Sequence, residues 1–412
     1  MLMNSPLLNS VSTLNVLLYG EPIATITHVG NDRTLFAFNE AYINDETRPV
    51  LSLGFKDALG GLITQFKPTQ IRLTPFFSNL LPEETMRNYL AQRAGVNPAR
   101  EFFLLRALGQ DLAGAITVVP ADGEALPPNL NETVIDNLEQ QTPMRFSLAG
   151  VQLKFSAVQQ ASGGLTIPAT GTGGSWIVKL PSSRFEAVPE NEYSMMTLAR
   201  MLGIDVPDIK LLPIEQIANI PAGIGQFGSS AFAIRRFDRS QGQAIHIEDF
   251  AQIFGVYPQD KYKTASMRNV AQVLSIEGNE QDIAEFIRRL VFNTLIGNAD
   301  MHLKNWSVIY KDKPTASIAP AYDFVSTIAY IPDDSAALKV SRSKKFSDFT
   351  FDELTHLAAK AMLPEKLVLE TARHTVDRFY EIWAKEKHHL ALTNRMISVL
   401  EKHFSTVPLR YQ

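Results

Sequence analysis

The sequence contains no cysteine, no long hydrophobic run and no excess of positive charge. The absence of cysteine excludes a disulfide framework, a thiolate nucleophile and a Cys-ligated zinc or iron–sulfur site. No run approaches the ~20 apolar residues that a membrane-spanning helix needs. The formal net charge of −4 provides no positive field to attract phosphates, which argues against broad nonspecific binding to nucleic acid.

The N-terminus also lacks the features of a secretory signal. Residues 1–18 are moderately apolar, but the first Lys or Arg is Arg33 and no small-residue cleavage site follows an apolar core. A cytosolic protein is therefore the default expectation. At 412 residues, 45% apolar and 20% charged, the chain has the composition of an ordinary globular protein. Its length corresponds to about two or three domains of ~150 residues.

The first third of the sequence indicates a mixture of strands and helices. Short apolar or alternating runs predict a small antiparallel meander of strands at 16–19, 23–26 and 34–38. A helix is predicted after Pro82, because acidic residues follow it at the positive end of the helix dipole and Gly95 suits the C-terminal end. The polar stretch 121–144 is predicted to be a linker.

A β-rich segment begins near Arg145 and is replaced by helices from about residue 248. The predicted strands are 155–158, 165–167, 176–180, 209–212 and 231–234, and the predicted helices include 190–202, 282–295 and two within 365–404. Thr350 with Glu353 predicts a capping box ahead of one more helix. A β-rich lobe followed by a helical lobe predicts an α+β fold with a ligand site between the lobes.

The most informative stretch begins at Asn298 and contains an aspartate and an asparagine five residues apart. Asp300 and Asn305 have the D-x-x-x-x-N spacing of the protein-kinase catalytic loop. In phosphoryl transfer the carboxylate accepts the proton of the attacking hydroxyl, while the amide oxygen binds Mg²⁺ beside the phosphates. The spacing alone is frequent by chance. A second carboxylate, Asp323, follows the next strand where D-F-G is expected, although Val325 replaces the glycine.

Lys179 lies within an apolar strand, where a charged amine is costly unless it is paired or meets an anion. The kinase strand V-A-I-K places its lysine in this way, against the nucleotide phosphates and a helix glutamate. Glu192 near the start of the next helix is the expected partner, and Glu190 is its rival. The alternative is a lysine at a sheet edge whose amine reaches solvent.

Four other features have simpler interpretations. Residues 147–154 lie where a kinase has its phosphate-covering loop, but they contain a single glycine. Gly171–Gly174 is richer in glycine, yet no helix follows, so we interpret it as a hairpin turn. His302 has no second His at ligand spacing, so we expect it to position the loop rather than bind a metal. The basic run Ser341–Lys345 is most simply a solvated surface, with a dock for an acidic substrate or a tRNA-bound partner as the alternative.

Taken together, these motifs resemble the HipA family of serine/threonine-kinase toxins. The matching segments, in the family's order, are Ser147–Lys154, Trp176–Pro181, Glu192–Tyr193, Arg236–Arg239, His246–Phe250, Gly297–Asn305 and Ala321–Asp323. Pro75–Pro82 and Gly109–Ile116 also look like the family's small first subdomain. The likeness spans roughly residues 14 to 385, and its motifs are highly specific.

The resemblance implies a two-lobed, protein-kinase-like α+β fold with a small N-terminal α/β subdomain. The implied divisions are an N-terminal subdomain at 14–118, a linker at 119–144, a kinase N-lobe at 145–240 and a helical C-lobe at 241–412.

The resemblance also implies roles for particular residues. Asp300 would be the catalytic base, Asn305 and Asp323 would bind Mg²⁺, and Lys179, supported by Glu192, would hold the phosphates of ATP. The remaining nucleotide-binding residues implied are Ala149, Gly150, Val151, Gln152, Leu153, Lys154, Arg235, Arg236, Phe237, His302, Leu303, Lys304 and Tyr322.

Regulation and partners are implied in the same way. Ser147 falls where the family autophosphorylates, but Arg145 stands where some shorter relatives carry a second serine, so control by two serines is not expected. Asn298-Ala299 replaces the His-Arg of eukaryotic kinases, so activation through a phosphorylated loop is not expected either. The implied partners are a HipB-like antitoxin dimer, operator DNA bound mainly through that antitoxin, and a protein target in translation such as an aminoacyl-tRNA synthetase.

Two other functions remain open. A small-molecule kinase of the aminoglycoside-phosphotransferase type shares the lobes and the D-x-x-x-x-N spacing, and substrate profiling would distinguish it. A catalytically silent, kinase-like corepressor would tolerate loss of Lys179, Asn305 or Asp323, and all three are present.

Overall fold

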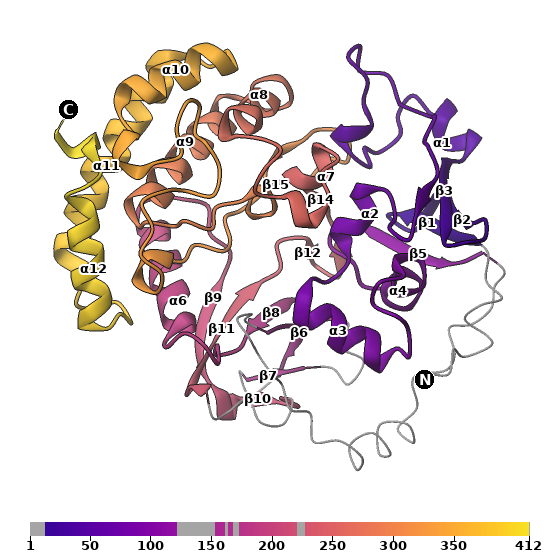
Figure 1. Cartoon of the computed structure of the whole chain (residues 1–412), viewed down its shortest axis with the longest axis horizontal. Coiled ribbons are helices and arrows are strands. Elements are labelled where there is room, and N and C mark those ends of the chain that lie inside the picture. Colours follow the sequence, from indigo (N-terminus) through magenta and orange to yellow (C-terminus); the bar gives the residue numbers. More distant parts are fainter. Residues whose placement is uncertain (1–12, 122–152, 161–163, 168–172, 221–226, 412) are drawn as a thin grey trace.

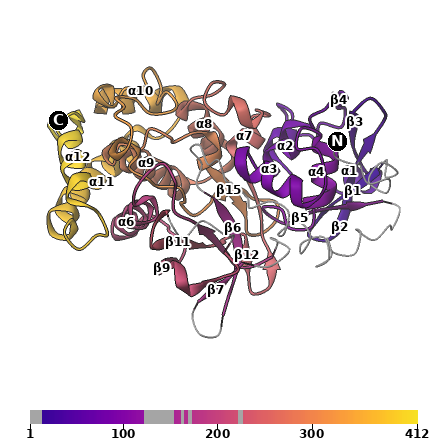
Figure 2. The same ribbon diagram turned by 60° about the horizontal axis from the view of Figure 1, so that its bottom comes forward.

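The computed structural model describes residues 13–121, 153–160, 164–167, 173–220 and 227–411. These residues form an N-terminal domain, a β-rich lobe and a helical lobe (Figure 1). The N-terminal domain, drawn in indigo and violet, and the last helices, drawn in yellow, lie at opposite ends of the molecule in both ribbon views (Figure 2). In the described parts of the chain, no helix combines the length and apolar character needed to cross a bilayer.

The N-terminal domain is a five-stranded antiparallel sheet with four helices. The strands are β1 (Thr13–Leu18), β2 (Glu21–His28), β3 (Arg33–Phe38), β4 (Thr69–Gln70) and β5 (Ile116–Pro120), and the helices are α1 (Glu40–Asn44), α2 (Pro75–Leu80), α3 (Glu84–Arg93) and α4 (Glu101–Leu108). Strand order is β4-β3-β2-β1-β5, so the last strand pairs with the first and closes the domain. Every second residue of β1 is fully buried, as expected of a strand that covers a core. The predicted meander and the helix after Pro82 are confirmed.

The β-rich lobe contains a six-stranded sheet. Its strands are β6 (Lys154–Gln159), β7 (Leu165–Thr166), β8 (Trp176–Lys179), β9 (Ile209–Pro213), β10 (Ile217–Ala218) and β11 (Ser230–Arg235), in the order β10-β7-β6-β8-β11-β9. Helix α6 (Val188–Met201) packs against β11 and β9. Gly171 and Thr172 lie outside the described residues, but the strands on either side of Gly171–Gly174 contradict the predicted hairpin. These strands, β7 and β8, each pair with β6 and not with each other.

The helical lobe surrounds one long buried helix. Its helices are α7 (Phe250–Ile253), α8 (Met267–Glu277), α9 (Glu280–Leu295), α10 (Phe351–Ala361), α11 (Glu365–Glu386) and α12 (Asn394–Phe404), and its strands are β12 (Arg239–Ser240), β13 (Gln243–Ala244), β14 (His246–Asp249), β15 (Ser307–Tyr310) and β16 (Ser317–Ile318). The predicted helix 282–295 is confirmed as α9, which begins with a capping box between Asn279 and Asp282. The two helices predicted within 365–404 are confirmed as α11 and α12.

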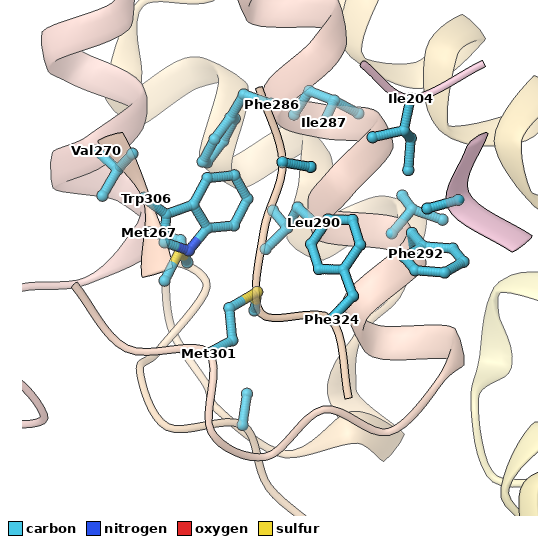
Figure 3. Close-up of a cluster of buried hydrophobic side chains, with 14 of the residues drawn as sticks. Ile204, Met267, Val270, Phe286, Ile287, Leu290, Phe292, Met301, Trp306 and Phe324 are labelled. Carbon is cyan, nitrogen blue, oxygen red and sulfur yellow. The ribbon is translucent and has the colours of Figure 1, made fainter. Parts of the chain in front are cut away.

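The apolar core around α9 fixes the segments that precede and follow the predicted catalytic residues. Trp306 packs on Phe286 with ring centroids 5.1 Å apart, and Phe324 packs on Phe292 at 5.1 Å. Met301, between the predicted catalytic residues Asp300 and Asn305, points into the same cluster and is 1% exposed (Figure 3). Apolar residues within or next to the Asp300 and Asp323 loops are therefore packed into the core, which fixes the position of both loops.

The predicted capping box at Thr350 is only half formed. The Thr350 hydroxyl accepts from the backbone N–H of Glu353 at 3.1 Å, as expected. The Glu353 carboxylate, however, accepts from the backbone N–H groups of Ser341 and Arg342, at 2.9 and 2.7 Å, instead of returning to the cap. Arg342 is also ion-paired to Glu353 and Asp352, so part of the basic run is neutralised within the chain.

A buried polar contact joins the N-terminal domain to the helical lobe. The carboxylate of Glu248, on β14, accepts hydrogen bonds from the Ser52 hydroxyl at 2.5 Å, the Leu53 backbone at 2.8 Å and the Tyr310 hydroxyl at 2.5 Å. His246, two residues earlier, donates from Nε2 to the Leu51 carbonyl at 2.8 Å. The contact thus uses donors and acceptors from both domains, and no cation takes part in the hydrogen bonds described for Glu248.

Candidate active site

Side chains from both lobes meet where β8, α6 and the segment after β16 come together. Lys179, at the end of β8, lies 2.5 Å from Glu192 Oε1 on α6 and is also ion-paired to Asp323. The pairing with Glu192 is the one expected from the sequence, whereas the backbone carbonyl of Glu190 accepts from Ser194. Lys179 and Glu192 are buried, at 8% and 0% exposure.

Charge and burial act against each other in this cluster. Burial alone lowers the pKa of Lys179, but Asp323 and Glu192 outweigh it and raise the pKa. Burial raises the pKa of Asp323, but Lys179 and Lys154 reverse this and hold it well below its usual range. Burial dominates at Glu192 and raises its pKa to about 7. The stable pair is therefore the Lys179 ammonium with the Asp323 carboxylate, and Glu192 supports it from the interior.

The loop that carries Asp300 is fixed by a sharp turn and a buried amide. Gly297 follows α9 with φ +62°, and a Cβ there would lie 2.3 Å from Ile328, so the position requires glycine. The buried Asn298 accepts from the Asp300 backbone at 3.1 Å and donates to the Asp323 carbonyl at 3.4 Å. Asn298 therefore links the two aspartate segments directly.

Asp300 itself is exposed to solvent at the edge of this cluster. Its Oδ1 accepts from the Tyr262 hydroxyl at 2.8 Å, and its carbonyl accepts from the side-chain amide of Asn305 at 2.9 Å. Partial burial raises the pKa of Asp300; the hydrogen bond from Tyr262 opposes this, and the negative charge of Asp323 adds to it. Since the Asn305 amide donates to Asp300, its oxygen is the atom that could bind a metal.

Two aromatic residues lie between the catalytic loop and the segment that connects the lobes. The Tyr322 hydroxyl donates to the Lys304 carbonyl at 2.9 Å and also contacts Ser307. Its ring lies 5.8 Å from that of Phe237, centroid to centroid. Asp323, the next residue, has φ +58°, a left-handed conformation that few non-glycine residues adopt.

Several other residues expected in the nucleotide site have side chains directed elsewhere. Arg236 is buried against Asp238 and Asp111, at 2.8 and 3.1 Å, and Arg235 pairs with Asp208 on the surface. Their backbone remains a candidate for contact with adenine, but their guanidinium groups belong to other ion pairs. Leu153 and Leu303 are buried in the apolar cores of the two lobes.

Three positively charged or basic residues lie nearer to the cluster. Lys154, at the start of β6, is directly opposite Lys179 and is exposed. Burial and the positive charge of Lys261 lower the pKa of His302 to about 3, so its imidazole is neutral. The Lys304 ammonium is bound by Glu83 at 2.8 Å and donates to the Asn79 carbonyl at 3.0 Å. Ser147, Ala149, Gly150, Val151 and Gln152 lie outside the described residues.

Sequence reasoning missed two neighbours of the catalytic loop, Glu83 and Tyr262. Glu83 was expected to favour a helix start, but its side chain makes no cap hydrogen bond and instead bridges Lys304 and Lys261, at 2.8 and 2.9 Å. Burial opposes ionisation of Glu83, yet the two lysines lower its pKa to about 2. Nothing local in the sequence connects position 83 with position 304, so only the docking of the domains reveals this contact.

The side chains present fit a magnesium–nucleotide complex. The Asp323 carboxylate and the Asn305 amide oxygen are the hard oxygen ligands that Mg²⁺ prefers, and Lys179 can neutralise phosphate. No group of three or more His, Asp or Glu suited to a metal occurs among the described residues. The donor set therefore fits a cation that takes its remaining ligands from phosphates and water.

A β-rich lobe, a helical lobe and a buried Lys–Glu pair bound to Asp323 define a protein-kinase-like fold. Residues 146–383 match the HipA-like C-terminal domain, and residues 14–119 match the HipA N-terminal domain. The chain therefore belongs to the HipA family, whose resemblance was evident in the sequence.

Relatives and one solved structure agree with this assignment. A Sinorhizobium fredii protein named "Putative kinase Y4dM" is 55% identical over 402 residues, which cover 97% of this chain and 98% of that protein. The serine/threonine-protein kinase toxin HipA of Shewanella oneidensis is 30% identical over 302 residues, or 64% of this chain and 65% of that toxin. The complex of HipA, HipB and operator DNA from Shewanella oneidensis MR-1 contains a chain with a TM-score of 0.72 and 23% identity, each chain being covered to 95%. The shared fold confirms the predicted two-lobed α+β architecture with its N-terminal subdomain.

Proposed function

We propose that this protein is an ATP-dependent serine/threonine protein kinase that acts as the toxin of a toxin–antitoxin pair. The observation that carries the proposal is the ion pair between Lys179 and Asp323, which are 144 positions apart, beside the loop that carries Asp300. A silent scaffold has no need to bury a lysine between two carboxylates, because burying charges is costly. The same cluster supplies the phosphate-binding and metal-binding groups of phosphoryl transfer.

In the proposed reaction, each side chain has one task. Lys179 exchanges its contact with Asp323 for the phosphates of ATP. Asn305 and Asp323 would hold Mg²⁺, which would neutralise charge on those phosphates. Asp300 orients the acceptor hydroxyl and takes its proton as the oxygen attacks the γ-phosphorus. The bond from that phosphorus to the β-phosphate oxygen breaks, and ADP leaves with the electron pair.

Substitution of the two aspartates tests the proposal. Asp300→Ala and Asp323→Ala should each lower transfer from labelled ATP by at least about a hundredfold, because base and metal ligand act in the chemical step. Asp312→Ala is the matched control, since Asp312 is exposed and caps a turn at Thr315. Full phosphoryl transfer by either of the first two variants would contradict the role assignments. Aminoglycosides offered as acceptors would test the small-molecule alternative.

Regulation through Ser147 is a second part of the proposal and depends on the family resemblance. A phosphate there would add about −1.5 to −2 charge next to the site for an anionic nucleotide, which should weaken ATP binding. Intact-mass spectra of wild type and Ser147→Ala after incubation with ATP should show one added phosphate in the wild type alone. The same adduct on Ser147→Ala would exclude this site.

The proposed partners are a HipB-like, DNA-binding antitoxin dimer and a protein target in translation. The Shewanella oneidensis structure contains HipA, HipB and operator DNA, and the net charge of −4 here agrees with an antitoxin that supplies most DNA contacts. Phosphoproteomics after brief expression of wild type and of Asp300→Ala would identify the target. A phosphoproteome that does not differ between the two would contradict kinase activity in the cell.

A further inference from the structure

Tyr262 is placed against the candidate catalytic base by a short loop. The loop follows a single 3-10 turn, Pro258–Asp260, and brings the Tyr262 hydroxyl to 2.8 Å from Asp300 Oδ1. Among the described residues, the Tyr262 hydroxyl is the side-chain donor to Asp300 Oδ1, and no side chain donates to Oδ2. One oxygen of the carboxylate is therefore held and the other is open.

The loop around Tyr262 is anchored on both sides of the catalytic loop. Lys261 is ion-paired to Glu83 of the N-terminal domain at 2.9 Å, and its carbonyl accepts from the Leu303 backbone at 3.5 Å. The Tyr262 ring meets the buried His302 ring edge to face, with centroids 5.1 Å apart. Tyr262 is 43% exposed, yet its backbone and ring have defined partners, so the hydrogen bond to Asp300 is not that of a freely rotating surface side chain.

A general base works best when a third group fixes its orientation, as the buried aspartate does for the histidine of a catalytic triad. We infer that Tyr262 is a positioning residue whose hydroxyl orients the Asp300 carboxylate so that Oδ2 faces the acceptor hydroxyl. This inference rests on the proposed function, in which Asp300 is the base. The opposite possibility is that the Tyr262 hydroxyl occupies the acceptor's place and slows the reaction. Removal of the hydroxyl should lower the rate in the first case and raise it in the second.

Tyr262→Phe removes the hydroxyl and keeps the ring against His302. The initial rate at which the full chain incorporates labelled phosphate should fall roughly tenfold, part of the 10²–10⁴-fold that a general base contributes. The KM for ATP should stay within about twofold, because the hydroxyl contacts Asp300 and not the phosphate-binding lysine. Tyr257→Phe is the matched control, since its hydroxyl donates to the Leu73 carbonyl at 3.1 Å in the same region, and it should behave as wild type.

A double-mutant cycle separates orientation of the base from a general structural effect. If Tyr262 acts only through Asp300, adding Tyr262→Phe to Asp300→Ala should cause no further loss of rate. A further tenfold loss in the Asp300→Ala background would show that the effect is structural and would overturn the inference. A Tyr262→Phe variant that is as fast as wild type, or faster, would overturn it as well.

The same measurements keep this inference distinct from the proposed function. If Asp300→Ala incorporates phosphate at least about a hundredfold more slowly than wild type, the proposed function stands and the Tyr262 result decides the inference alone. If wild type and Asp300→Ala are indistinguishable, the proposed function fails, and the role of Tyr262 fails with it.

Discussion

Two of the contacts between the N-terminal domain and the helical lobe, those of Glu248 and Glu83, differ in chemistry and in burial. At Glu248 the contact is fully buried and consists of hydrogen bonds to a carboxylate without a cation. At Glu83 the contact is ionic and partly exposed, with 30% exposure of the glutamate side chain against 16% for Lys261 and 15% for Lys304.

The difference indicates that the two contacts have different effects on stability and on the loop that carries Asp300. Buried donors and acceptors are costly to leave without partners, so the Glu248 contact should hold the domains together. Partly exposed ion pairs add little to stability, but those of Glu83 reach the residues next to Asn305 and Tyr262. The Glu83 contact should therefore affect the candidate catalytic loop more than the stability of the fold.

The largest expected effect is that of Glu248→Ala. The substitution leaves the Ser52 hydroxyl, the Leu53 N–H and the Tyr310 hydroxyl buried without their acceptor, at about 1 kcal/mol or more each. The free energy of unfolding should fall by about 3–4 kcal/mol, measured by urea denaturation. Glu277→Ala removes a partly exposed ion pair with Lys56 and serves as the control, with an expected change below about 1 kcal/mol. Equal losses of unfolding free energy in Glu248→Ala and Glu277→Ala would contradict the expected difference between buried and exposed contacts.

A smaller effect is expected from acid, which should remove the stabilising contribution of His246 to the buried contact. Burial lowers the pKa of His246 to about 4, below its ordinary value of 6.5. Between these values the unfolded chain binds the proton more readily, so stability is full above about pH 6.5 and declines as the pH falls toward 4. The contribution of His246 alone should fall by about 2 kcal/mol between pH 7.5 and pH 5, whereas burial raises the pKa of Glu248 to about 7, so the contribution of Glu248 rises over the same range. His246→Gln can still donate to Leu51 but lacks the loss due to the imidazole, so its free energy of unfolding should improve relative to wild type by about 2 kcal/mol between pH 7.5 and pH 5. An identical slope in both proteins would contradict this account.

The smallest expected effect on stability is that of Glu83→Gln, below about 1 kcal/mol, because its ion pairs are partly exposed. Its effect on phosphoryl transfer should be larger, about three- to tenfold, since Lys261 and Lys304 lose the anion that holds the catalytic loop in place. Lys56→Gln is the matched control, because it breaks the interdomain ion pair with Glu277 instead. If both variants transferred phosphate at the wild-type rate, the ionic contact would have no role in the loop.

The sequence was most informative where function depends on order along the chain. The Lys179–Glu192 pair was predictable because a strand lysine and a glutamate in the following helix are only 13 positions apart. The order Asp300, Asn305, Asp323 and the apolar helix before them indicated a kinase-like C-lobe for the same reason. Local patterns determine elements and short connections, and these elements place the cluster.

Contacts between distant segments could not be predicted from such patterns. Arg236 was expected beside the nucleotide, but Asp111, 125 positions earlier, takes part in holding its guanidinium group in the contact between domains. Glu353 fitted a capping box, yet the backbone of Ser341 and Arg342 binds its carboxylate. In both cases a charged side chain has several nearby partners that could bind it with similar strength. Which partner it binds depends on how complete helices and strands pack together.

The distance along the chain between the two halves of each contact has a consequence for synthesis on the ribosome. The N-terminal sheet can close once Pro120 has emerged, since β5 pairs with β1. Ser52 cannot complete the contact that it shares with Glu248 and Tyr310 until these later residues have been translated. In the same way, Glu83 cannot form its ion pair until Lys304 has been translated. A chain released before Asp323 is made would therefore carry a finished first domain but could not form the Lys179–Asp323 pair on which the proposed function depends.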